Sequence, residues 1–542
     1  SVKCWRVRTV AAARFAEFNV PDVVAPNDDE PLAVRLAVTT RNATTTSLSF
    51  AATVHALNAG ARAQVWLALV LLIVTYGFIV LDVVHHTLVA VVGSFVALLL
   101  ITAIGKQPTL VTVVGHLEVG TLALLFGMMI IVEQTSATGL FEWAAVRAFE
   151  VSRGNVRRLT IILCLITGVL SAFLDNVTTI LLLVPVTISL CKVLDLDPVP
   201  LLMGEVLLSK LGGAATLVGD PPNIIIGSQL SAHINFVSFI VNMTPGVLVV
   251  FVPTLLHLLF VYRADVRGVR DLDTADLRRN HPIKDGVLAV KCGVVGALVL
   301  FAFFLQPVHG VDPAWAALAG GFALLLLSSP HDVEYPLRHI EYDSLVFFAA
   351  LFVLIESLAE MGLIRLIGRG FVAFVLLAPA SGQLAFALTL LLWLSAISSA
   401  FIDNIPYTAT MVPVIMQMSR DPTLALPIAP LAWALAWGAD IGGNGTIVGA
   451  TDNIVVAGIS KAEGYPITFL SHFKIGFPNM LISCLFANFY LLTVYVGFGI
   501  GVGYSLYEFE EGLLDEFGNP LSSAASSAAS TMAAMADAMT SP

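Results

Sequence analysis

Long apolar stretches separated by short polar breaks fill the chain from about residue 64 to residue 499. Runs of about 18 apolar residues are long enough to cross the roughly 30 Å core of a bilayer as helices. The pattern predicts uninterrupted spans at 64–82, 86–104, 120–147, 236–262, 286–306, 312–329, 345–366 and 470–499. Two more stretches, 200–230 and 428–460, are interrupted in the middle by glycine and polar residues. We therefore predict an all-α multi-pass membrane protein with two broken helices.

Two further apolar stretches, 159–193 and 383–417, carry an Asp-Asn pair near the middle. In the first stretch the pair is the end of the sequence Ser-Ala-Phe-Leu-Asp-Asn, which finishes at Asn176. In the second it is the end of Ser-Ala-Phe-Ile-Asp-Asn, which finishes at Asn404. A charged side chain in lipid costs about 2.5 to 3.5 kcal/mol even on the lenient insertion scale, so a repeated one indicates a site. Two apolar legs around a polar tip predict a re-entrant hairpin, or else a kinked span followed by another span.

The second half of the chain repeats the first at an offset of 223 to 230 residues. The matches are His116 with His339, Glu118 with Glu341, Glu133 with Glu356, Gly139 with Gly362, Asp175 with Asp403, Pro185 with Pro413, Gly212 with Gly442, Gly213 with Gly443, Thr216 with Thr446, Gly219 with Gly449 and Asn223 with Asn453. Each half then has five spans and one hairpin. An odd number of crossings predicts an inverted repeat, the architecture of many secondary transporters.

Composition and charge support this interpretation and give the domain boundaries. The 542 residues are 57% hydrophobic and 12% charged, whereas soluble domains are about 25% charged. Basic residues cluster in the breaks at 153–158, 263–284 and 461–474, which predicts that these lie in the cytoplasm. We expect a lumenal or extracellular, β-rich extramembrane segment at 1–62, a first repeat at 63–262, a cytoplasmic linker at 263–285, a second repeat at 286–500 and a disordered tail at 501–542.

The repeated polar residues form the predicted site. Hairpin tips and helix breaks offer unpaired backbone groups, carboxylates, amides and hydroxyls to a hard cation, a proton or a substrate. The predicted ion- or substrate-binding residues are Asp175, Asn176, Thr178, Thr179, Gly213, Thr216, Asp220, Asn223, Asp403, Asn404, Thr408, Gly443, Asn444, Thr446, Asp452 and Asn453. The predicted coupling residues are Lys210, Asp440, Glu133 and Glu356.

Structural roles are open for several of these residues. Each Asp-Asn pair fits an N-cap of the second hairpin leg, and the glycines fit close packing of helices. Lys210 is expected to pair with Asp440, or with Asp220 and Asp452, and alternatively to compete with a coupling cation. The five cysteines have no metal spacing, and His85 and His86 are expected at a span end and not as ligands. We therefore predict no metal site and no cofactor besides a coupling Na⁺ or H⁺.

The motifs around the breaks resemble those of the P protein group of the ion transporter superfamily. The resemblance rests on Leu208 to Asn223, on Phe173 to Asn176 and on Thr451 to Val455. It extends to arsenite permeases, sodium/proton antiporters and citrate transporter-like proteins. It implies a homodimer with a scaffold and a moving part built from the hairpins and broken helices. It also implies an organellar membrane, endolysosome- or melanosome-like, or the plasma membrane.

The function predicted from the sequence is ion-coupled secondary transport of a small inorganic ion or anion, by alternating access of the elevator type. The tips carry Asp-Asn where the sodium-coupled dicarboxylate branch has Ser-Asn-Thr, which favours proton or sodium binding at Asp175 and Asp403. A chloride channel of the P protein type is the alternative. The chain shows no nucleophile constellation or phosphate loop, so we predict no enzyme and no nucleic-acid partner.

Overall fold

The computed structural model describes residues 59–81, 84–104, 108–268, 283–328, 334–338, 340–421 and 423–500. Residues 1–58 of the β-rich segment predicted at 1–62 and the tail at 501–542 lie outside them, as do His339 and residues 269–282 of the linker. The last four residues of that predicted segment, 59–62, are helical. The described residues form helices and contain no strand. Eight of these helices are long and apolar enough to cross a membrane. Two shorter apolar stretches are Ala63–Ile79, within α1 (Ala59–Leu81), and α14 (Pro313–Ser328). The prediction of an all-α multi-pass membrane protein is therefore confirmed.

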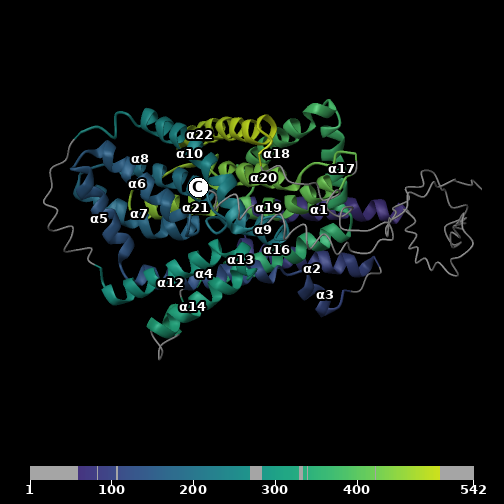
Figure 1. Ribbon diagram of the computed structural model, residues 1–542, viewed down its shortest axis with the longest axis horizontal. Coiled ribbons are helices and arrows are strands. Elements are labelled where there is room, and N and C mark those ends of the chain that lie inside the picture. Colours follow the sequence, from purple (N-terminus) through teal and green to yellow (C-terminus); the bar gives the residue numbers. More distant parts are fainter. Residues whose placement is uncertain are drawn as a thin grey trace, which may run out of the picture. The chain divides into compact units, whose positions relative to one another are not determined.

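One layer of helices forms a frame. It contains α2 (His86–Ala103), α4 (Val119–Ala137), α12 (Gly286–Phe304), α14 (Pro313–Ser328) and α16 (Tyr342–Glu360), and it runs along the lower part of Figure 1. The helices α4 and α14 pack together, as do α2 and α16. The contact between α4 and α14 is very close at Gly127, where an added Cβ would lie 2.5 Å from the backbone of Ala317.

The other layer contains the two hairpins and the two broken helices. The hairpins are α6 (Val156–Ser171) with α7 (Asn176–Val193), and α18 (Gln383–Ser399) with α19 (Asn404–Ser419). The broken helices are α8 (Val199–Gly213) with α9 (Pro221–Gln229), and α20 (Ile428–Gly442) with α21 (Thr451–Ala462). In each half the first hairpin leg packs on the first part of the broken helix. The order of elements is the same in both halves, while the inverted orientation stays a prediction.

Long helices complete this layer. They are α10 (Phe236–Val261) and α22 (Phe469–Leu491), the latter continuing into the π-helix η3 (Leu492–Gly497). These helices pack against each other, α10 on α8 and α22 on α20. The remaining elements are α1 (Ala59–Leu81), α3 (Leu110–Gly115), α5 (Leu140–Ser152), α13 (Gln306–His309), α15 (Glu334–Arg338), α17 (Leu363–Val375), η1 (Ala380–Gly382) and η2 (Ile447–Gly449).

Two spans predicted as continuous are divided in the structure. The stretch 120–147 contains the end of α4 and the start of α5, and 345–366 contains the end of α16 and the start of α17. Gly139 (φ 76°) and Gly362 (φ 88°) separate the helices in the left-handed conformation, which glycine adopts without a steric penalty and which ends a helix. The two glycines are a matched pair of the sequence repeat. The same helix-ending glycine therefore explains why the ends predicted for both spans, 120–147 and 345–366, were wrong.

Candidate functional site

The aspartates of both hairpin tips cap the second leg. The Asp175 carboxylate accepts a hydrogen bond from the backbone N–H of Thr178 at 3.0 Å and another from the Thr178 hydroxyl. Asp403 accepts from the backbone N–H of Ile405 at 3.0 Å and from the hydroxyl of Thr451 at 3.0 Å. Both aspartates are partly exposed. The N-cap role considered for these residues is therefore what the structure shows, and it leaves them within reach of water.

The asparagines beside them point into the protein interior. Asn176 and Asn404 are each 2% exposed, and both donate to Oδ2 of Asp220 in the break between α8 and α9. The Asn176 amide nitrogen lies 2.5 Å from that oxygen and the Asn404 amide nitrogen 3.4 Å. The two hairpin tips therefore meet at one carboxylate of the first broken helix.

Lys210 lies in the same interior, near the end of α8. Its ammonium is 3.5 Å from Oδ2 of Asp220 and 3.2 Å from Oδ1 of Asp452. All three residues are buried. Of the two arrangements considered for Lys210, the structure has the pairing with Asp220 and Asp452. The fourth buried charge, Asp440, interacts with Lys210 over a longer range and accepts a hydrogen bond from Asn223 at 3.0 Å.

The two broken helices hold their breaks together in the same way. The Asn223 amide donates to the carbonyl oxygens of Gly213 at 3.1 Å and Thr216 at 3.3 Å. The Asn453 amide donates to the equivalent carbonyls, those of Gly443 at 2.7 Å and Thr446 at 2.8 Å. The sequence repeat thus has a repeated hydrogen-bond pattern. In both breaks the amide nitrogen of the asparagine makes these hydrogen bonds, and the amide oxygen takes no part in them.

Each break is also joined to its hairpin. The hydroxyl of Thr216 donates to the carbonyl of Ala172, and the hydroxyl of Thr446 donates to the carbonyl of Ala400 at 2.5 Å. Gly219 is packed so tightly that an added Cβ would lie 2.6 Å from the Gly213 carbonyl oxygen and 2.7 Å from the Ser171 carbonyl oxygen. Backbone carbonyls of the hairpin and of the broken helix therefore converge at this position.

A set of buried oxygen atoms in this region has no hydrogen-bond partner among the described residues. They are the hydroxyls of Thr179 and Thr408, the amide oxygens of Asn223, Asn444 and Asn453, and Oδ1 of Asp440. Asn444 uses its amide nitrogen to bond the Leu207 carbonyl at 3.2 Å. Buried acceptors without partners are costly. Hydroxyl, amide and carboxylate oxygens are the donor set of a hard cation.

The predicted glutamates lie elsewhere. Glu356 lines a polar cavity of about 390 Å³, whose other lining residues are His116, Glu118, Gln229, Phe352, Ile355, Ala359, Ile364, Arg365, Pro413, Met416, Gln417 and Arg420. No hairpin-tip residue belongs to this lining. Glu133 is half-buried in α4 and is not part of it. Burial, with the Glu356 carboxylate nearby, raises the pKa of Glu118.

Sequence reasoning missed two polar groups. The Ser171 hydroxyl donates to the amide oxygen of Asn176 at 2.5 Å; Ser171 belongs to the repeated six-residue motif and was identifiable from it. Glu205 in α8 is fully buried, accepts a hydrogen bond from Thr187 at 2.6 Å, and its Oε2 has no hydrogen-bond partner among the described residues. A lone glutamate within an apolar stretch was the available signal.

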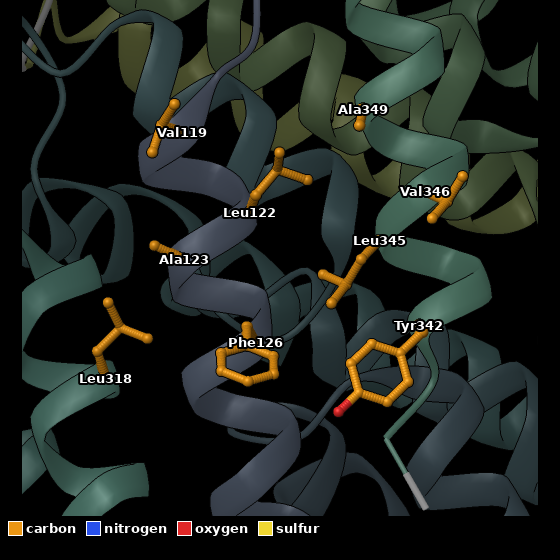
Figure 2. A pocket seen from close by; sticks show the side chains of 9 residues that line it. All are labelled: Val119, Leu122, Ala123, Phe126, Leu318, Tyr342, Leu345, Val346 and Ala349. Atoms are coloured by element: carbon orange, nitrogen blue, oxygen red, sulfur yellow. The ribbon is translucent and has the colours of Figure 1, made fainter. Parts of the chain in front are cut away.

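A second hollow lies in the frame layer and is apolar. Figure 2 shows its lining side chains, which come from α4, α14 and α16. They are Val119, Leu122, Ala123, Phe126, Leu318, Tyr342, Leu345, Val346 and Ala349, and its volume is about 430 Å³. Within this lining, the Tyr342 hydroxyl is the one polar side-chain group. An ion would find no compensation for its lost hydration there, so the polar interior around Lys210 is the candidate site.

Comparisons with known proteins agree with this description. A family model described as citrate transporter matches residues 76–438. The chain is 41% identical to the P protein of Sus scrofa and 39% identical to the P protein of Homo sapiens, in each case over 514 residues that cover 82% of this chain and 61% of the relative. The chain therefore spans about three fifths of the length of these mammalian relatives.

A bacterial relative is matched over nearly its full length. The 46 kDa membrane protein of Mycobacterium leprae is 36% identical over 432 residues, which cover 79% of this chain and 99% of the relative. Among solved structures, the YdaH transporter of Alcanivorax borkumensis has a similar fold, with a TM-score of 0.52 and 17% identity, covering 82% of this chain and 99% of the other.

Proposed function

The chain belongs to the citrate transporter family and is a membrane transporter, and from this premise we propose that it is an ion-coupled secondary transporter. Its coupling ion, Na⁺ or H⁺, binds where the two hairpin tips meet the two broken helices. Alternating access moves this site by an elevator-type displacement. The transported species is a small inorganic ion or anion.

The observation that carries this proposal is the charge balance of the buried site. Asp220, Asp440 and Asp452 are each 1% exposed or less. The ammonium of Lys210 lies against two of them, Asp220 and Asp452. Burying an uncompensated carboxylate costs several kcal/mol. Protons or metal cations are therefore needed to neutralise the excess acid. The unpartnered oxygens of Thr179, Thr408, Asn223 and Asn453 supply ligands of the type that Na⁺ prefers.

The same balance disfavours the chloride channel. An anion entering this interior would meet three buried carboxylates and one ammonium. Like charges in a site of low dielectric constant repel each other strongly. An anionic substrate therefore enters after the cations have bound, which is the behaviour of a coupled transporter and not of an anion pore.

The elevator movement is supported by the way in which the helices pack. The frame helices pack chiefly on each other, as α4 does on α14 and α2 on α16, whereas the hairpin helices pack on the broken helices, as α6 does on α8 and α18 on α20. We infer that the hairpins and broken helices move as a unit along the frame. The frame helices would form the homodimer.

The test is flux in proteoliposomes that contain the purified full chain. Uptake of chloride, sodium, citrate, arsenite and silicate is measured at two pH values, with and without a sodium gradient. A reversal potential that shifts with the proton or sodium gradient supports coupled transport. One that follows chloride alone supports the channel. Asp220→Asn should abolish gradient-driven flux, while Glu334→Gln, at an exposed carboxylate on α15, should leave it unchanged.

A further inference from the structure

A cluster of two histidines and one aspartate lies at the ends of two frame helices, and none of its residues belongs to the buried set around Lys210. His85 precedes α2, His86 is its first residue, and Asp343 is in the first turn of α16. One ligand atom from each side chain lies within 4.8 Å of the others. We propose that this cluster binds a first-row divalent cation, with Zn²⁺ as the probe, and that its occupancy slows transport.

The geometry suits a metal ion. The Nε2 atoms of His85 and His86 lie 3.5 and 3.9 Å from the same oxygen, Oδ2 of Asp343. Zinc binds imidazole nitrogen and carboxylate oxygen at about 2.0–2.2 Å, so two ligands of a tetrahedral site are about 3.4 Å apart. The observed separations need small side-chain adjustments to reach that value. Water can complete the coordination, because the side chains of His85 and Asp343 are 55% and 53% exposed.

Ring packing and a hydrogen bond beside the cluster hold its ligand side chains in place. The His86 ring packs edge-on against Phe347 at 5.1 Å and stacks on the His85 ring at 4.6 Å. The Thr87 hydroxyl donates to the Asp343 carbonyl at 3.5 Å, which joins α2 to α16 beside the ligands. Imidazole and carboxylate together suit zinc and similar transition metals better than Mg²⁺ or Ca²⁺, which take oxygen ligands.

The cluster is also connected to the second hairpin. The helix α16, which carries Asp343, packs against both α2 and α19, and α19 is the second leg of the hairpin whose tip carries Asp403. A bound divalent cation would add positive charge at this position. In the proposed transport cycle, which this part of the inference depends on, the extra charge would hold the Asp403 tip near the α2 end of the frame and slow its departure.

The binding test uses the full chain in lipid nanodiscs, stripped with a chelator and titrated with Zn²⁺ against a competing zinc-binding dye. The wild type should bind one equivalent. His85→Ala and Asp343→Asn should each weaken this binding by at least about tenfold, because loss even of a group that only supports a metal ligand costs about 10- to 100-fold in affinity. Both positions are exposed, so the variants should fold. The controls His309→Ala and Glu334→Gln remove an exposed imidazole and an exposed carboxylate and should retain the equivalent. Equal binding by the wild type and both cluster variants would overturn the site.

The transport test adds Zn²⁺ to the proteoliposome assay. Zinc should slow flux by the wild type and leave the flux of His85→Ala unchanged. Binding without slowing would overturn the regulatory part of the inference. Absence of coupled flux before any zinc is added would instead count against the proposed function, and the binding result would be unaffected by it.

Discussion

Asn176 and Asn404, one from each hairpin tip, donate hydrogen bonds to the same oxygen atom, Oδ2 of Asp220. Because the two residues belong to equivalent motifs, this contact brings the two halves of the sequence repeat together at one point. The shared acceptor also faces Lys210 at 3.5 Å. A change in the charge of Asp220 therefore alters its interactions with both hairpin tips and with Lys210 at the same time.

Asp175→Asn and Asp403→Asn should each abolish gradient-driven flux and leave the protein folded. Asparagine is as good an N-cap as aspartate, so the caps of α7 and α19 survive while the charges are removed. Flux and size-exclusion profiles of the purified variants check this. Asp285→Asn is the matched control, because Asp285 caps α12 through the Leu288 N–H at 2.9 Å without belonging to a hairpin tip. Wild-type flux in both tip variants would remove these aspartates from the coupling site.

Lys210→Met should destabilise the protein and make its stability depend on cations. Removing one partner of a buried ion pair costs about 3–5 kcal/mol because the other charge is left uncompensated. Here Asp220 and Asp452 would lose their ammonium. Protonation or a bound cation neutralises them, so the variant should gain thermal stability relative to the wild type as the pH falls or as Na⁺ replaces choline.

The two conditions in that experiment identify the coupling ion. Rescue by Na⁺ at constant pH indicates a sodium site, and rescue by acid alone indicates a proton site. A variant whose melting temperature follows the wild type under every condition would show that Lys210 does not balance these carboxylates. Lys291→Met is the control, because the Lys291 ammonium donates to the Leu327 carbonyl in the frame layer. Its thermal stability should not depend on pH or Na⁺ more than that of the wild type.

Much of the fold and part of the site followed from the sequence. The apolar helices are interrupted where the Asp-Asn motifs and the glycine clusters predicted breaks, because these residues end otherwise continuous helices. The re-entrant path of each Asp-Asn pair of helices stays a prediction. Which polar atoms meet could not be predicted. Spacing placed Lys210 opposite Asp440 in the repeat, but the pairing with Asp220 and Asp452 depends on how the two halves pack. The inward turn of Asn176, beside an outward Asp175, depends likewise on the cap geometry.

Tyr76→Phe should change the rate of transport without removing an ion ligand. The Tyr76 hydroxyl on α1 donates to the Pro406 carbonyl at 2.8 Å and lies 2.7 Å from the Thr410 hydroxyl, which joins α1 to the second hairpin. If that hairpin moves, this contact breaks in each cycle. A hydrogen bond contributes about 1 kcal/mol, so losing it should shift the conformational equilibrium about fivefold.

The shift is measurable as the maleimide-labelling rate of Phe401→Cys, a partly exposed position beside the tip. The matched control is Tyr490→Phe, which removes a hydroxyl bonded to the Asn242 carbonyl at 2.7 Å, between α10 and α22. Equal labelling and equal flux in the wild type and Tyr76→Phe would indicate that α1 and the second hairpin move together.

Gly219→Ala should destabilise the protein and weaken cation binding, whereas Gly296→Ala should do neither. An added methyl group at Gly219 would lie 2.6 and 2.7 Å from two backbone carbonyl oxygens, so the break or the hairpin has to shift; such overpacking costs about 1–3 kcal/mol. Gly296 in α12 has no heavy atom within 4 Å of its Cβ position. Thermal stability with and without Na⁺ measures both effects. If the carbonyls around Gly219 take no part in binding, Gly219→Ala will lose stability by the same amount in both conditions, and the cation site must then lie at the other break, around Gly449.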